Sequence, residues 1–193
     1  MQHDTSFARL VSLACHDLRT PLATVHGFAA TLSKTMDLAD PADRYVEMIE
    51  AASHQIAELL DELSVAARIE GGRYEPVPRE VDTLALAHAA AERLGADRVR
   101  VSGGGAVVET DVEAVDRGVS ALVQAALRHG GLDEVEVAVG GWEIRVSPVT
   151  DSAAKVVLGQ DLRDLGAAVA VRVLAERGGT TEVVDGTLVI RIA

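Results

Sequence analysis

Apolar side chains in the first 70 residues recur every three or four positions, a spacing that predicts two amphipathic helices. The segment DLADPAD, residues 37–43, interrupts the pattern, so we expect the two helices to form an antiparallel hairpin. The first series consists of Phe7, Val11, Ala14, Leu18, Leu22, Val25, Ala29, Leu32 and Met36. The second consists of Tyr45, Ile49, Ala52, Ile56, Leu59, Leu63 and Ala66, and Gly71 and Gly72 follow it.

Two long helices alone enclose little of their apolar faces. The solution we expect is a homodimer, in which two hairpins join into a four-helix bundle. The alternative is that the second half of the same chain covers the hairpin.

The segment GGRYEPVPRE separates the hairpin from a second half with mixed patterns. Most of its strands are joined by short turns, among them Asp185-Gly186, so we expect an α/β sandwich with a mixed sheet. The predicted class is α+β, with a hairpin domain over residues 1–70, a linker over 71–80 and a sandwich domain over 81–193. The helical patterns cover residues 83–94, 112–128 and 162–177, and the strand patterns cover 98–102, 134–139, 142–148, 181–184 and 187–192.

Composition excludes several classes of protein. Of the 193 residues 48% are hydrophobic, enough for a core, and the net charge of −12 is spread over both halves, which disfavours a nucleic-acid partner. The single Cys15 cannot form an internal disulfide, and no apolar run is long enough to span a membrane. The first ten residues lack the pattern of a secretion signal, so we expect a cytoplasmic protein with no membrane partner.

His16 is the candidate chemical group of the first helix. At 100° per residue it lies about 200° from the stripe residues on either side of it, and therefore faces solvent. Asp17 beside it and Thr20 one turn further on converge with it on one patch. A neutral imidazole is a nucleophile near pH 7, a carboxylate can orient it, Thr20 could position a water, and Arg19 could place a cation near a phosphoryl group. The alternative is an ordinary solvated helix surface.

The sequence CHDLRTPL, Cys15 to Leu22, resembles the phosphoacceptor motif of the sensor histidine kinases. In that family a dimerisation helix carries His, then Asp or Glu, then Leu-Arg-Thr-Pro-Leu, and the match covers seven consecutive positions from His16. From this resemblance we expect the second half of the chain to be similar to the catalytic domain of these kinases. The resemblance also implies that His16 is phosphorylated, that Asp17 assists phosphoryl transfer and that Thr20 helps in dephosphorylation.

The second half departs from the family at three nucleotide-binding motifs. Alignment of Ala126–His129 with the family's Ala-x-Lys-Tyr puts Ala125 where an asparagine would hold Mg²⁺, and alanine has no oxygen ligand to offer. The segment SPVTDSAAKVV lacks the glycines of Asp-x-Gly-x-Gly, and we interpret its Asp151 as a turn residue. In DLGAAVAV, Asp164 replaces the first glycine of Gly-x-Gly-Leu, where its charge would repel phosphate.

With these departures the chain is most similar to the histidine phosphotransferases of phosphorelays, which keep the kinase fold with a degenerate ATP-binding domain. Such proteins exchange a phosphoryl group between their histidine and the aspartate of response-regulator receiver domains. The resemblance implies no autokinase activity, no cofactor or metal on this chain, and Mg²⁺ supplied by the regulator. The surface expected to dock the receiver domain consists of Ala23, Thr24, Gly27, Glu58, Asp61 and Glu62.

Three other functions stay open at this point. One is a true histidine kinase with divergent nucleotide contacts. Another is a pseudokinase that binds a response regulator without chemistry. The last is a net phosphatase acting on the regulator, which the same residues would support.

Overall fold

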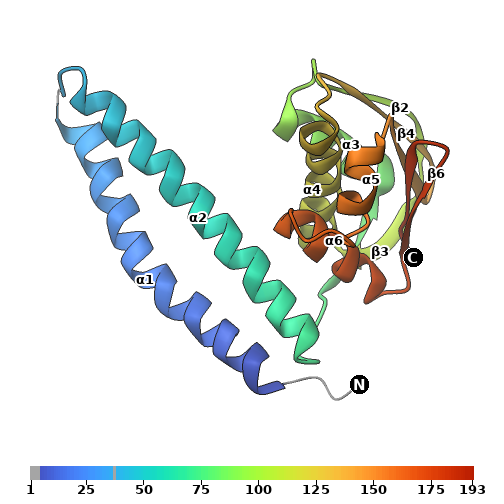
Figure 1. Ribbon diagram of the computed structural model, residues 1–193, viewed down its shortest axis with the longest axis horizontal. Helices are drawn as coiled ribbons and strands as arrows, with labels where there is room; N and C mark the ends of the chain where they lie inside the picture. Colours follow the sequence, from blue (N-terminus) through green and yellow to red (C-terminus); the bar gives the residue numbers. More distant parts are fainter. Residues whose placement is uncertain (1–4, 37) are drawn as a thin grey trace. The chain divides into compact units, whose positions relative to one another are not determined.

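The computed structural model describes residues 5–36 and 38–193, and the chain divides into two compact units, the second of which begins at Glu75. The first unit is a helical hairpin made of α1 (Thr5–Thr35) and α2 (Ala42–Glu70), as the apolar spacing predicted. The two helices run antiparallel along most of their length (Figure 1).

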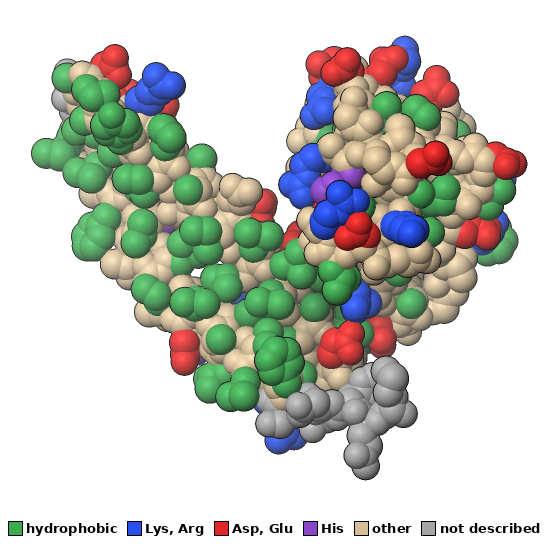
Figure 2. Space-filling model, viewed as in Figure 1, with side chains coloured by type: hydrophobic (Ala, Val, Ile, Leu, Met, Phe, Trp, Pro, Cys, Tyr) green, Lys and Arg blue, Asp and Glu red, His purple; other side chains and the backbone are tan. Residues whose placement is uncertain are grey.

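Mostly small side chains separate the two helices of the hairpin. The residues buried in this unit are Ala8, Cys15, Ala29, Val46, Ser53, Leu60, Val65 and Ala67. The large side chains of the predicted stripes are mainly outside this contact, and Figure 2 shows hydrophobic groups gathered along the hairpin. The exposed stripe residues are Phe7, Leu18, Val25, Leu32, Met36, Tyr45, Ile49, Ile56, Leu59 and Leu63. Four large apolar residues outside the predicted stripes are exposed as well, namely Leu10, Leu13, Phe28 and Met48.

The second unit is a two-layer α/β sandwich, which confirms the predicted α+β class. A five-stranded sheet with strand order β2-β4-β5-β7-β6 is covered on one face by the helices (Figure 1). Strands β2 and β4 are parallel and the other pairs are antiparallel, so the sheet is mixed. The strands are β2 (Val99–Gly105), β4 (Val135–Gly141), β5 (Glu143–Ser147), β6 (Thr180–Val184) and β7 (Thr187–Arg191). The helices are α3 (Thr83–Leu94), α4 (Val112–Gly130), α5 (Asp151–Val157) and α6 (Leu165–Ala175).

The core of this unit lies between the sheet and the helices. Alternate residues of β4 and β5, including Val137 and Ile144, are buried, as is Leu122 of α4, while the residues between them face the open side. This period of two is what a sheet with one covered face requires.

Charged side chains cover part of the open face of the sheet. Glu143 of β5 accepts hydrogen bonds from Arg145 at 2.6 Å and from Arg191 of β7 at 2.9 Å. The hydrogen bond from Arg145, together with the charges of both arginines, holds the pKa of Glu143 below its ordinary value.

Three elements of the structure, β1 (Pro78–Asp82), β3 (Val107–Asp111) and α5, were not predicted from the sequence. Strand β1 pairs with β3 in a separate two-stranded sheet. Both strands are short and largely exposed, so neither shows the apolar run of a core strand. Because β1 begins at Pro78, the predicted linker over residues 71–80 is wrong at its end. Asp151 is the first residue of α5, not a turn residue, and Thr150 precedes it as the cap.

Strand β2 is longer than predicted because it continues through three glycines. Gly103 pairs with Val139, and a side chain at Gly103 would place its Cβ 2.0 Å from the Val139 carbonyl oxygen. Glycine lowers strand propensity, which is why the sequence pattern ended at Ser102, yet this pairing requires it.

In the part of the chain that the structure describes, we find no helix with both the length and the apolar character needed to cross a bilayer.

Replacement of a core side chain is expected to destabilise the second unit strongly. Leu122 is fully buried, so Leu122→Ala should lower the free energy of unfolding by about 2–5 kcal/mol. Leu162 is 71% exposed, and the matched Leu162→Ala should change it by less than about 0.5 kcal/mol. Urea unfolding followed by the fluorescence of Trp142, which belongs to this unit, measures both changes. Equal losses in the two variants would contradict the position of Leu122 in the core.

Candidate active site

His16 projects from α1 into solvent, as the helical geometry predicted. Its side chain is 78% exposed, whereas the preceding Cys15 is fully buried in the hairpin. The helix therefore uses Cys15 for packing and presents the next residue, His16, to solvent.

Asp17 defines the chemical state of the His16 ring. Its Oδ1 lies 3.2 Å from Nδ1 of His16. An ionised carboxylate only accepts hydrogen bonds, so in this contact Nδ1 carries a proton, and in the neutral ring the lone pair is then on Nε2. Nε2 of the neutral ring therefore has the lone pair that a nucleophile needs, and a carboxylate in the position of Asp17 can stabilise positive charge on the ring.

Thr20 lies on the same face of α1 as His16, one turn further along, and is exposed. Pro21 follows it inside the helix. Because proline has no backbone N–H, the carbonyl of Asp17 lacks its usual partner in the helical ladder. The helix therefore has a backbone carbonyl without its helical donor at Asp17, and an exposed hydroxyl-bearing residue one turn after His16.

Arg19 binds the second helix. Its Nη2 donates to Oδ1 of Asp61 on α2 at 2.7 Å, and both side chains are about half exposed. The sequence analysis placed Arg19 near the phosphoryl group and Asp61 in the docking surface. The structure pairs these two residues with each other. In this arrangement each neutralises the other.

The remaining residues of the expected docking surface are divided between the two helices. Ala23, Thr24 and Gly27 are exposed on α1, and Ala23 and Gly27 lie within about 20° of His16 around the helix axis. A side chain at Gly27 would meet nothing within 4 Å. On α2, Glu58 is exposed and lies 3.4 Å from His54, while Glu62 is half-buried.

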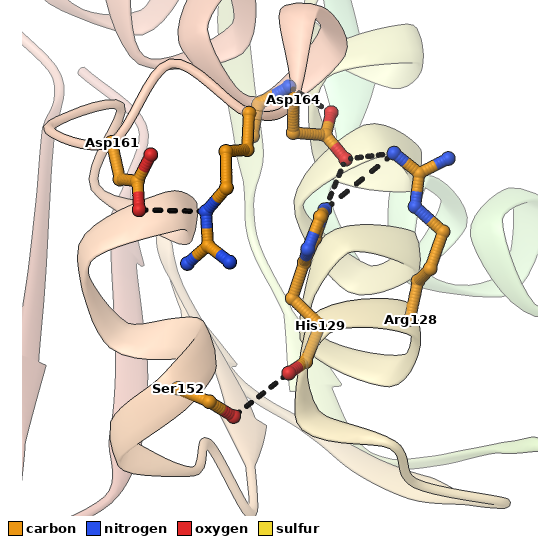
Figure 3. A network of polar contacts seen from close by, with 7 residues as sticks. Arg128, His129, Ser152, Asp161 and Asp164 are labelled. Atoms are coloured by element: carbon orange, nitrogen blue, oxygen red, sulfur yellow. Dashed lines mark hydrogen bonds and ion pairs between the residues drawn. The ribbon is translucent and has the colours of Figure 1, made fainter.

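The positions that depart from the nucleotide motifs lie in the second unit. Ala125 is fully buried in α4. Asp164 is the N-cap residue of α6, and its side chain contacts both Arg128 and His129 (Figure 3). The sequence did not point to the contact of His129 with Asp164, because the two residues are 35 positions apart and no spacing pattern links them. Among the described residues, no three His, Cys, Asp or Glu side chains are grouped so as to hold a metal ion.

The contact with Asp17 predicts the tautomer of His16. In the intact protein the Nδ1-protonated form should be enriched, and Asp17→Ala should lower its ratio to the Nε2-protonated form by roughly twofold or more. Long-range ¹H–¹⁵N spectra of the histidine rings measure this ratio, with the exposed His26 of the same helix as the reference. A His16 spectrum that does not change in Asp17→Ala would contradict the assignment of Nε2 as the nucleophile.

Comparison with known proteins places this geometry in a family. The model of the His Kinase A (phospho-acceptor) domain matches residues 8–72, which include the whole site around His16. The sensor protein KdpD of Mycobacterium tuberculosis is 30% identical over 150 residues, a match that covers 71% of this chain and 17% of KdpD.

Two solved structures share the fold of the chain. Full-length ShkA in complex with AMPPNP superposes with a TM-score of 0.68 at 18% identity, covering 96% of this chain and 46% of that one. The Acinetobacter baumannii histidine kinase AdeS superposes with a TM-score of 0.58 at 16% identity, covering 92% of this chain and 97% of that one. With its phosphoacceptor hairpin and its kinase-like α/β unit, the chain belongs to the sensor histidine kinase superfamily.

Proposed function

We propose that this chain is a histidine phosphotransferase that exchanges a phosphoryl group between the aspartate of a response-regulator receiver domain and His16, as a cytoplasmic homodimer and without binding ATP. The observation that carries the proposal is a contrast between the two units. The hairpin presents an exposed imidazole with an oriented ring, while Ala125 and Asp164 stand where the family resemblance implies an asparagine and a glycine.

The proposed transfer needs no proton movement at His16. The lone pair of Nε2 attacks the phosphorus of the aspartyl phosphate, a P–N bond forms, and the P–O bond to the regulator breaks. The aspartate leaves as a carboxylate. The ring gains positive charge, which Asp17 stabilises through the Nδ1–H hydrogen bond. Catalysis is then chiefly in-line positioning of donor and acceptor, with the regulator supplying Mg²⁺.

The receiver domain would dock beside His16 on α1. Ala23 and Gly27 follow the histidine along one face, and their small side chains allow the backbone of a partner to approach. Thr24, Glu58 and Glu62 would border this contact. Arg19 and Asp61 would serve it by holding α2 beside α1.

Dimerisation follows from the hairpin's exposed apolar side chains. Domains of this family are dimeric, and here the large side chains of both helices are left outside the contact between α1 and α2. A second hairpin would bury them in a four-helix bundle.

An ATP-dependent histidine kinase is the second candidate. The similarity to KdpD extends over 150 residues, beyond the phosphoacceptor domain, and so includes part of the second unit. This candidate requires nucleotide contacts that do not use the asparagine and glycines of the family motifs.

Two labelling reactions separate the candidates. The purified chain is incubated with γ-labelled Mg-ATP and, separately, with a receiver domain carrying labelled aspartyl phosphate. The proposal expects acid-labile label on the chain only from the receiver domain. His16→Gln should abolish the transfer, and the matched His26→Gln on the same helix should leave it within about twofold of the unchanged protein.

Acid-labile label that appears from Mg-ATP alone and is lost in His16→Gln would overturn the proposal in favour of the kinase. Transfer that survives His16→Gln would contradict His16 as the acceptor in both candidates. Binding of the receiver domain with no label from either source would favour the pseudokinase. Loss of label from the receiver as inorganic phosphate, with none retained on the chain, would favour a net phosphatase.

The proposed dimer predicts a sharp effect of charge on the exposed face of the hairpin. Leu59 is 44% exposed on α2, and Leu59→Glu would place a carboxylate in the interface twice, raising the dimer dissociation constant by roughly 100-fold or more. Leu162→Glu, in the second unit, is the matched control and should leave the constant unchanged. Sedimentation velocity over a range of concentrations measures both, and equal behaviour of the two variants would contradict a dimer built on this face.

A further inference from the structure

Asp164, at the beginning of α6, carries a carboxylate that is contacted by two side chains from the end of α4 and by a backbone N–H of α6 itself (Figure 3). Oδ1 of Asp164 accepts the backbone N–H of Ala167 at 3.1 Å. Oδ2 accepts from Nη2 of Arg128 at 2.9 Å and lies 3.0 Å from Nε2 of His129, which donates to it because a carboxylate only accepts. The Asp164 side chain is 12% exposed and that of His129 is 15% exposed. Both carboxylate oxygens of Asp164, which is nearly buried, therefore accept hydrogen bonds.

The two side-chain donors are supported by contacts that do not involve Asp164. Arg128 and His129 are consecutive residues in the last turn of α4. The carbonyl oxygen of His129 accepts a hydrogen bond from Oγ of Ser152 at 2.8 Å, and Oγ1 of Thr150 lies 2.9 Å from the same Ser152 atom. The beginning of α5 thus binds the backbone of His129 independently of Asp164, which holds the last turn of α4 that carries both donors.

The groups around Asp164, namely the beginning of a helix and two side-chain donors, favour an anion at this position. The first turn of a helix presents N–H groups and a positive end of the helix dipole. The first turn of α6, Leu165 to Ala168, has no acidic residue, so Asp164 supplies the anion at this end. A guanidinium and an imidazole N–H complete a set of donors that would suit a phosphate oxygen as well as a carboxylate.

We infer that Asp164 is a tethered anion that fills an anion-binding site formed by the beginning of α6, Arg128 and His129, and thereby excludes phosphate groups from it. A carboxylate held on the same chain competes at a high effective concentration, and free phosphate cannot displace it. The inference deepens the proposed function and rests on it in one respect, since it gives the residue-level reason why this end of the unit binds no ATP. The inference also predicts something that the proposed function does not, namely that removal of the Asp164 carboxylate creates a phosphate-binding site.

The test compares four full-length proteins, with inorganic phosphate as the probe. They are the unchanged chain, Asp164→Ser, Asp161→Ser and the double variant Asp164→Ser/His129→Gln. Serine is also a good N-cap, so Asp164→Ser removes the charge and keeps an acceptor for the Ala167 N–H. Asp161 is the matched control because it is an acid in the same loop whose carboxylate pairs with Arg163, at 2.7 Å. Melting temperatures are measured in sodium phosphate and in sodium chloride of equal ionic strength at pH 7.

Asp164→Ser should show a saturable rise in melting temperature of about 3 °C or more in phosphate over chloride. The unchanged chain and Asp161→Ser should show less than about 1 °C, and the double variant should lose most of the gain. If Asp164→Ser does not give a cooperative melting transition, Asp164→Asn takes its place, because asparagine caps helices equally well.

No gain in a folded Asp164→Ser, or an equal gain in all four proteins, would overturn the inference. This outcome is distinct from failure of the proposed function, which is decided by label from Mg-ATP on the unchanged chain. If the unchanged chain takes no label from Mg-ATP and Asp164→Ser gains no phosphate site, the proposed function stands and the inference about Asp164 is refuted.

Discussion

Two helices packed side by side touch along a narrow strip, so most of the surface of each remains outside their contact. In this hairpin the strip is lined by small residues such as Ala8, Cys15 and Ala29, and the large apolar side chains lie beyond it. The hairpin therefore cannot complete its own core. This shortage of enclosed surface is what a second hairpin would relieve, and it leaves the remaining polar face of α1 to carry His16.

The second unit solves the same burial problem within one chain. Its sheet has one face covered by helices, with Val137 and Ile144 beneath them, and one face open to solvent, where Glu143 pairs with Arg145 and Arg191. A self-contained core of this kind does not depend on a bound nucleotide for its packing. The fold can accordingly keep its shape while individual positions such as Ala125 and Asp164 depart from the family's motifs.

Local patterns in the sequence predicted much of this architecture. The spacing of apolar residues gave both long helices, and Asp185-Gly186 forms the expected turn with positive φ values of 49° and 71°. The exposure of His16 followed from rotation about one helix axis. The pattern missed β1 and β3, whose exposed residues carry no core signal. It could not find the contact of Arg19 with Asp61, 42 residues away, because such pairs depend on how helices pack and not on spacing within one helix.

That last contact has a consequence for how the protein can change in evolution. A substitution that removes the acid at Asp61 takes from the guanidinium of Arg19 the partner it has in this structure, three residues from His16. A released cation there would alter the charge that an incoming phosphoryl group meets. Under the proposed function, a change at residue 61 that adapts the docking surface to a new partner would therefore also change the charge beside His16, so the two positions would not vary independently.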